Sequence, residues 1–328
     1  MWAVPVLAIY SGLRRALAGV PSFAMGHDHV HSHGIDARSS ERWLAVALAL
    51  DLGFAATEAV AGVLGDSVAL LSDAAHQATD AAAIALALTA VRLARRPPTS
   101  RFTFGLQRSE ILSAQVNGAA LLVLAGIVGV EAARRLSSPP DLDGELVIVV
   151  GLVGVLVNGA AAWALARANR ASLNVEGAFL HNLADLWSSL AAALAGLVIV
   201  TVGYREADSI AALAVCVLMV VGGWGLLRES GRVLLEGTPK GMDSDEIGRT
   251  LAAHPGVSEV HDLHVWEVTS GFPTLSAHVL VPAGQDCHQR RRELQDLLVR
   301  RFGIDHSTLQ VEHERSPRLI RLETQRDG

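Results

Sequence analysis

The chain has 328 residues, of which 51% are hydrophobic and 18% charged, and its mean hydropathy is +0.35. The apolar residues lie in long blocks, which indicates a membrane protein with a soluble end and excludes an ordinary soluble domain. The net charge of −6, without a continuous basic patch, argues against a nucleic-acid partner. Two cysteines, Cys216 and Cys287, form neither a disulfide framework nor a CxxC metal motif.

The N-terminal segment, residues 1–41, contains a tract of alternating histidines. We expect this tract to collect metal ions weakly and without fixed geometry, or to have no measurable effect. We also expect translation to begin at Met25, so that residues 1–24 are an upstream extension. The histidines of the tract are His27, His29, His31 and His33.

Six apolar blocks within residues 42–235 are long enough to cross a bilayer, for which about 20 residues are needed. Basic residues crowd the segments on the N-terminal side, whereas the opposite loops hold only Arg134, Arg135 and Arg205. The positive-inside rule therefore predicts an integral membrane protein with both termini in the cytoplasm. The predicted spans are Trp43–Leu64, Val68–Leu93, Ile111–Val130, Leu146–Ala166, Ala178–Val202 and Ile210–Leu227.

Residues 236–315 have the composition of a small soluble α+β domain, followed by a loose tail over 316–328. Helical periodicity covers 245–253 and 287–302, and strand-like alternation covers 260–269, 274–281 and 308–312. The order αββαβ predicts a ferredoxin-like domain. The whole chain is thus expected to be a six-helix membrane protein with a cytoplasmic domain.

Two apolar spans each carry a histidine and an aspartate four residues apart. His76 and Asp80 lie in the second span, and His181 and Asp185 lie in the fifth. Residues at i and i+4 share one helix face, so two such helices could supply the four ligands of a tetrahedral zinc ion. Each pair alone could equally be a structural hydrogen-bonded couple between helices. The repetition of the pair favours the metal site.

Protons and metal compete for imidazole and carboxylate ligands, which gives a physical route for exchanging Zn²⁺ against H⁺. Three further acids, Asp51, Glu58 and Asp73, lie in the first and second spans and are candidates for a proton path. An aspartate at mid-membrane costs about 2.5–3.5 kcal/mol, so these residues need a polar surrounding. Interhelical hydrogen bonding explains Asp51 and Glu58 equally well, and a residue such as Asp73 more often bonds a nearby backbone or hydroxyl group.

The C-terminal domain holds a second candidate zinc site. His261, His278, His288 and Glu312 lie on separate predicted elements of this small domain. Simple alternation along the first strand places His261 on the face of Leu263 and Val265, and His264 on the opposite face. Single surface histidines are common, so the prediction rests on the combination.

The paired HxxxD motifs and the segment Val257-Ser258-Glu259-Val260-His261-Asp262-Leu263-His264-Val265-Trp266 resemble the cation diffusion facilitator family of metal exporters, in its zinc-type bacterial branch. The resemblance covers about Arg42 to Glu314. It implies a homodimer in the lipid bilayer of the bacterial inner membrane that exchanges cytoplasmic Zn²⁺ for protons by alternating access. It assigns the transport site to the two His–Asp pairs and the cytoplasmic zinc to the four C-terminal residues. It further implies a salt bridge between Arg108 and Glu236 near the dimer interface.

The leading prediction is therefore a secondary transporter that exports Zn²⁺, with Cd²⁺ and Co²⁺ as other candidate substrates. Histidine on both helices suits zinc, whereas sites made of oxygen ligands suit manganese or magnesium. An intramembrane zinc hydrolase is the first alternative, but an enzyme would need an open coordination position and a general base. A metal sensor that does not transport is the second, and it leaves the intramembrane acids without a purpose.

Overall fold

The computed structural model describes residues 37–64, 68–137 and 144–314. The predicted histidine tract and the loose tail lie outside the described residues. Within the helices, the side chains of Glu58, Asp73 and His76 also lie outside the described part, so only their positions along the chain are given.

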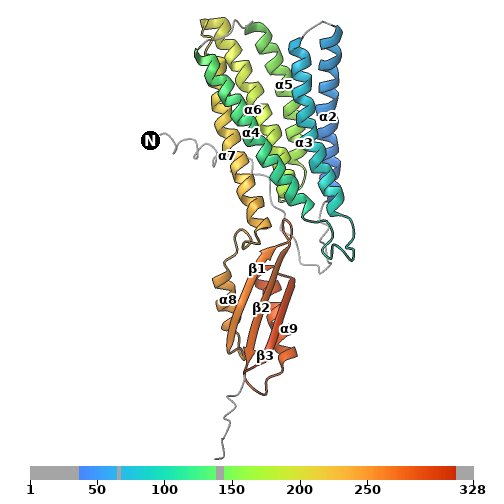
Figure 1. Cartoon of the computed structure of the whole chain (residues 1–328), viewed down its shortest axis with the longest axis vertical. Coiled ribbons are helices and arrows are strands. Elements are labelled where there is room, and N and C mark those ends of the chain that lie inside the picture. The colour runs from blue at the N-terminus through green and yellow to red at the C-terminus, as the bar shows by residue number, and fades with distance from the viewer. Residues whose placement is uncertain (1–36, 65–67, 138–143, 315–328) are drawn as a thin grey trace, which may run out of the picture. The chain divides into compact units, whose positions relative to one another are not determined.

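Six long helices form a bundle, and a small α+β domain follows (Figure 1). Among the described residues, five helices are long and apolar enough to cross a membrane. The sixth, α2, has 28 residues and packs against α3 and α5; its crossing stays a prediction. The helices are α2 (Ala37–Leu64), α3 (Val68–Ala94), α4 (Ser109–Ser137), α5 (Gly144–Ala166), α6 (Leu173–Val202) and α7 (Ala207–Leu234).

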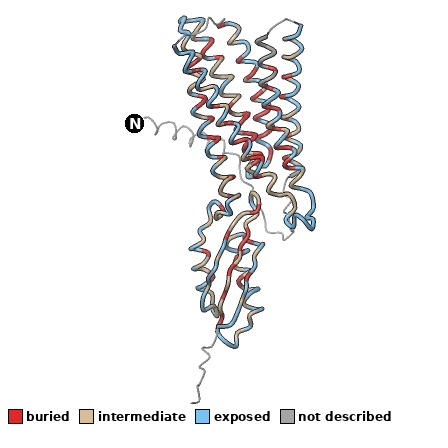
Figure 2. Tube along the Cα trace, viewed as in Figure 1, coloured by how far each residue is buried: buried red, intermediate tan, exposed pale blue. Residues whose placement is uncertain are grey.

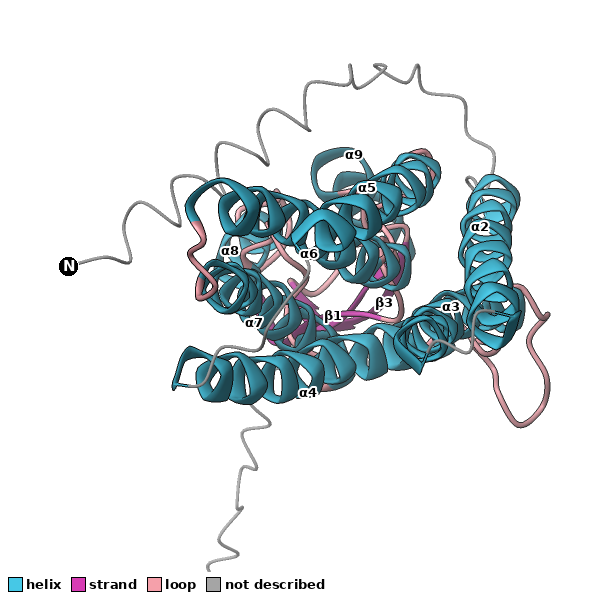
Figure 3. Cartoon of the chain, turned by 90° about the horizontal axis from the view of Figure 1, so that it is seen from above, coloured by secondary structure: helices cyan, strands magenta, loops and turns pink. Residues whose placement is uncertain are grey.

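The helices associate in pairs, α2 with α3, α4 with α7, and α5 with α6, as the view along the bundle shows (Figure 3). Buried residues follow the inner faces of the helices (Figure 2). Large apolar side chains such as Ile127, Leu156 and Trp224 are exposed on the outer faces. In water such a surface would be unfavourable, whereas lipid chains cover it without cost.

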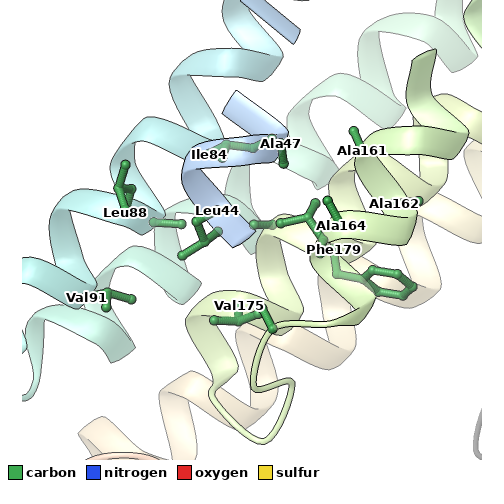
Figure 4. Packing of buried hydrophobic residues seen from close by; sticks show 14 residues of the cluster. Leu44, Ala47, Ile84, Leu88, Val91, Ala161, Ala162, Ala164, Val175 and Phe179 are labelled. Carbon is green, nitrogen blue, oxygen red and sulfur yellow. The ribbon is translucent and has the colours of Figure 1, made fainter. Parts of the chain in front are cut away.

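One apolar cluster joins α2, α3, α5 and α6. Leu44 of α2 and Ile84 of α3 are buried beside Ala161 of α5 and Val175 of α6 (Figure 4). Ser172 caps α6 by accepting a hydrogen bond from the backbone N–H of Val175, so α6 begins five residues before the predicted span. This packing fixes α3 against α6, the two helices that carry the His–Asp pairs.

The C-terminal domain confirms the predicted αββαβ order. It consists of α8 (Ser244–Ala252), β1 (Glu259–Glu267), β2 (Pro273–Val281), α9 (Cys287–Phe302) and β3 (His306–His313). The sheet order is β1-β2-β3, with β2 antiparallel to β1 and parallel to β3. Ile247, Leu275, Leu294 and other buried residues of both helices and the sheet form its core.

The expected alternation along β1 is wrong at one point. His261 pairs with His278, and His264 pairs with Ser276, so three steps on β1 oppose two steps on β2. This is a β-bulge, and Asp262 within it has φ 53°. The extra residue returns His264 to the same face of the sheet as His261. Strict alternation assumes an unbroken register, whereas the inserted residue inverts the period-two pattern beyond the bulge.

Helices α5 and α6 approach closely because glycines face their neighbours. A Cβ added at Gly151 would lie 2.7 Å from the backbone nitrogen of Ala193 and 2.9 Å from the oxygen of Ser189. We expect Gly151→Val to destabilise the bundle by about 1–3 kcal/mol through overpacking. Thermal unfolding of the protein in detergent measures the effect.

Gly225→Val is the matched control, since nothing lies within 4 Å of a Cβ at this exposed glycine of α7. If both variants melted at the wild-type temperature, the close approach of α5 and α6 would not limit stability.

Candidate metal centre

Three of the predicted ligands meet between α3 and α6. Ligand atoms of Asp80, His181 and Asp185 all lie within 4.8 Å of one another. His181 Nε2 is 2.9 Å from Asp80 Oδ1 and 3.9 Å from Asp185 Oδ2. Helical spacing explains the geometry, because His181 and Asp185 are one turn apart on α6 and Asp80 faces them from α3.

The three side chains are enclosed. The side chain of His181 is 6% exposed, that of Asp80 is 4% exposed and that of Asp185 is 14% exposed. A histidine and two carboxylates are a ligand set that zinc accepts. His76 lies in α3 one helical turn before Asp80. Its side chain lies outside the described part of the chain, so its role as the fourth ligand stays a prediction.

A cavity of about 330 Å³ adjoins the cluster. Asp80 and Asp185 line it together with Gln77 of α3, Asn158 of α5 and other residues of α2, α5 and α6. Such a volume accommodates a cation with part of its hydration shell. The arrangement can therefore hold a partly hydrated divalent cation beside two carboxylates.

Asp51 of α2 is a further acid near the cluster. It is 1% exposed, and neither carboxylate oxygen has a hydrogen-bond partner within the described part of the chain. It interacts electrostatically with Asp80 and His181. A buried carboxylate without a partner is costly unless it faces a cation or carries a proton, so Asp51 belongs to the polar surroundings of the site.

Two polar side chains that line the cavity were not among the predicted site residues. Asn158 Nδ2 donates to Ser189 Oγ at 3.2 Å, and Ser189 Oγ donates to the backbone oxygen of Asp185 at 2.9 Å. This chain ties α5 to α6 beside Asp185. An asparagine within the apolar span Val147–Ala166 was the available signal, and it indicated interhelical contact without indicating the site.

The predicted cytoplasmic ligands are only partly brought together. The rings of His261 and His278 have centroids 5.4 Å apart on one face of the sheet. Glu312 lies on β3 opposite Leu280, two residues along β2 from His278, and accepts a hydrogen bond from Gln310. His288 is exposed in the first turn of α9. Within the described chain, these four residues do not converge as the intramembrane cluster does.

Two acids lie beside the paired histidines: Glu259 Oε1 is 3.4 Å from His261 Nδ1, and Asp262 lies in the bulge. Its Oδ2 lies 3.9 Å from His278 Nε2, and its Oδ1 lies 3.0 Å from His264 Nε2. Simple alternation separates Asp262 and His264 from His261, and only the bulge brings them to the face of His278. The other predicted pair, Arg108 and Glu236, has Nη2 and Oε1 3.1 Å apart between two solvent-exposed side chains.

An enclosed His–carboxylate cluster within a bundle of apolar helices defines a membrane protein that can hold a cation inside the bilayer. The sequence matches the family described as "Cation efflux transmembrane domain" over residues 44–235. Residues 239–314 match the family described as "Cation efflux protein, cytoplasmic domain".

Similar curated proteins cover most of the chain. The metal cation efflux system protein CzcD of Cupriavidus metallidurans is 38% identical over 288 residues, 88% of this chain and 90% of that protein. The zinc transporter ZitB of Escherichia coli is 37% identical, covering 89% and 93%. A cadmium, cobalt and zinc/H(+)-K(+) antiporter of Bacillus subtilis is 33% identical, covering 88% and 93%.

A solved structure, the metal-bound C-terminal domain of the CzcD transporter from Cupriavidus metallidurans, is 36% identical, with a TM-score of 0.21. The match covers 22% of this chain and 99% of that chain.

The chain belongs to the cation efflux family and is an integral membrane transporter. It is not an enzyme, so the hydrolase alternative is excluded.

Proposed function

We propose that this chain exports Zn²⁺ from the cytoplasm in exchange for protons, by alternating access at a site formed by His76, Asp80, His181 and Asp185. The observation that carries the proposal is the convergence of Asp80, His181 and Asp185 within 4.8 Å between two apolar helices. Cd²⁺ and Co²⁺ are further candidate substrates, and the names of the relatives support all three ions.

Charge balance explains why such a site exchanges ions. Two carboxylates neutralise a divalent cation in a medium of low dielectric constant, where an isolated ion is unfavourable. When the metal leaves, protons on the same ligands restore part of that balance. Metal and protons therefore exclude each other at one set of atoms, which is the requirement for antiport.

The proposed setting is the bacterial inner membrane, with both termini in the cytoplasm. The basic loop residues on the side of the C-terminal domain support this orientation. We further propose that the protein works as a homodimer, with the pair Arg108–Glu236 near the interface. His261, His278, His288 and Glu312 would hold a second zinc in the cytoplasmic domain, and the close approach of the His261 and His278 rings, whose centroids are 5.4 Å apart, supports those two residues.

Removing one carboxylate should stop transport. We expect inverted vesicles containing wild-type protein to accumulate zinc when a pH gradient is imposed, and Asp185→Ala to lower the initial rate at least tenfold, because a charge-balancing ligand is lost. Uptake of radioactive zinc measures the rate. Asp208→Ala, at the first turn of α7, is a control of the same type away from the cluster. Equal rates for wild type and Asp185→Ala would refute the assignment of the site.

Substitution of Asp51 should change the number of protons exchanged per zinc ion without changing zinc binding. We expect zinc entry to alkalinise the vesicle lumen as protons leave, and Asp51→Asn to reduce the protons moved per zinc ion, because the amide cannot carry one. A lumenal pH dye and zinc uptake, recorded together, give the ratio. An unchanged ratio would remove Asp51 from the proton path, and zinc uptake without any pH change would reject antiport.

The cytoplasmic zinc should depend on the paired histidines. We expect His261→Ala combined with His278→Ala to reduce the zinc bound per full-length chain, measured by elemental analysis after dialysis against micromolar zinc. His254→Ala combined with His306→Ala is the control, because these histidines lie away from the bulge. Unchanged zinc content in the first variant would exclude this site and leave the intramembrane site untouched.

A further inference from the structure

Two arginines and two tryptophans form a cluster where α2 begins and α5 ends. The rings of Trp43 and Trp163 stand edge to face, with centroids 5.7 Å apart. The guanidinium carbon of Arg167 lies 4.1 Å from the centroid of Trp163 and 5.6 Å from that of Trp43. The guanidinium of Arg42 lies 5.7 Å from the centroid of Trp43.

Among the described residues, neither arginine has a carboxylate partner. Arg42 and Arg167 are exposed, and neither forms an ion pair within residues 37–64, 68–137 and 144–314. The neighbouring arginines, in contrast, form ion pairs: Arg92 and Arg95 both contact Glu41, and Arg170 contacts Glu176. A guanidinium that lies over a ring face keeps its N–H edge free to donate two parallel hydrogen bonds to an anion.

The cluster lies at the end of the apolar spans. The span in α5 ends at Ala166, so Arg167 follows it directly. Trp163 is 55% exposed on the outer surface, and Trp43 packs against the buried cluster of the bundle. Tryptophans are enriched at the membrane–water boundary, where the ring contacts acyl chains and the polar edge meets head groups. The two arginines are thus at head-group level.

Backbone contacts place the cluster on the side of the C-terminal domain. The N–H of Asn169 donates to Ser40 Oγ of α2 at 3.1 Å, which holds the α5–α6 turn against the start of α2. The N–H of Leu173, at the end of the same turn, donates to Ser270 Oγ of the C-terminal domain at 3.1 Å. The cluster therefore faces the leaflet next to that domain.

We propose that Arg42, Trp43, Trp163 and Arg167 bind the phosphate head group of an anionic phospholipid in this leaflet. The arginines donate to the phosphate oxygens, and the acyl chains lie along the exposed face of Trp163. Basic sites between the ends of transmembrane helices select lipids by head-group charge. A lipid held there joins α2 to α5, two of the helices that line the cavity at the metal centre.

The test is lipid binding to the purified full-length protein. Native mass spectrometry, with phosphatidylglycerol or phosphatidylethanolamine added to the detergent solution, gives the apparent affinity for each lipid. We expect wild type to prefer phosphatidylglycerol, and Arg42→Gln combined with Arg167→Gln to bind it on the order of tenfold more weakly. Binding of phosphatidylethanolamine should not change. Arg42→Lys combined with Arg167→Lys keeps the charge, loses the bidentate geometry, and should have an intermediate affinity.

Arg96→Gln combined with Arg101→Gln is the matched control. It removes the same charge from exposed positions between α3 and α4, at the same end of the bundle, and should bind phosphatidylglycerol as wild type does. An equal loss of phosphatidylglycerol affinity in this control would show that the lipid is attracted by the overall positive charge and not by a specific site, and would overturn the proposal. Wild-type affinity in the first variant, or competition by inorganic phosphate at the lipid's own concentration, would overturn the proposal. Wild-type melting temperatures for the variants exclude misfolding.

Discussion

The contact between His181 and Asp80 links the candidate metal centre to the packing of the helices. It joins α6 to α3 at 2.9 Å, with both side chains almost wholly enclosed. Buried ionisable groups are stable only when they face one another, a cation or water. Asp185 and the adjoining cavity supply the remaining parts of that surrounding, so the same atoms that hold the helices together are those that can take up a metal ion.

The apolar packing holds in place the helices that form this contact. The cluster around Leu44, Ile84 and Val175 fixes α2, α3, α5 and α6 at one end of the bundle, and Gly151 lets α5 approach α6 beside the cavity. The hydrogen bonds from Asn158 through Ser189 to the backbone of Asp185 add a polar tie at the same depth. Asp51 reaches the site from α2 without a hydrogen-bond partner among the described residues. A shift of α2 or α5 relative to α3 and α6 would therefore change both the cavity and the charge around the candidate metal site.

Sequence periodicity predicted the helices and the αββαβ domain, because helical and strand periods depend on local patterns that neighbouring residues repeat. The four-residue spacing of His181 and Asp185 predicted their shared face for the same reason. Sequence periodicity carries no information about contacts between distant segments. The nearness of Asp51 to Asp80, the bond from Asn158 to Ser189, and the bulge at Asp262 all depend on how whole elements pack or pair. The bulge reversed the predicted face of His264, since one inserted residue inverts an alternation of period two.

Zinc is proposed to bind between α3 and α6 through imidazole and carboxylate ligands. Zinc-edge X-ray absorption on the His261→Ala, His278→Ala protein tests this proposal most directly, because that variant removes the proposed cytoplasmic ligands. We expect one zinc with nitrogen and oxygen ligands at about 2.0–2.1 Å, the scattering pattern of imidazole, and no sulfur. We also expect the added substitution His181→Ala to abolish this zinc. A sulfur ligand, or the same spectrum and zinc content after His181→Ala, would contradict the proposal.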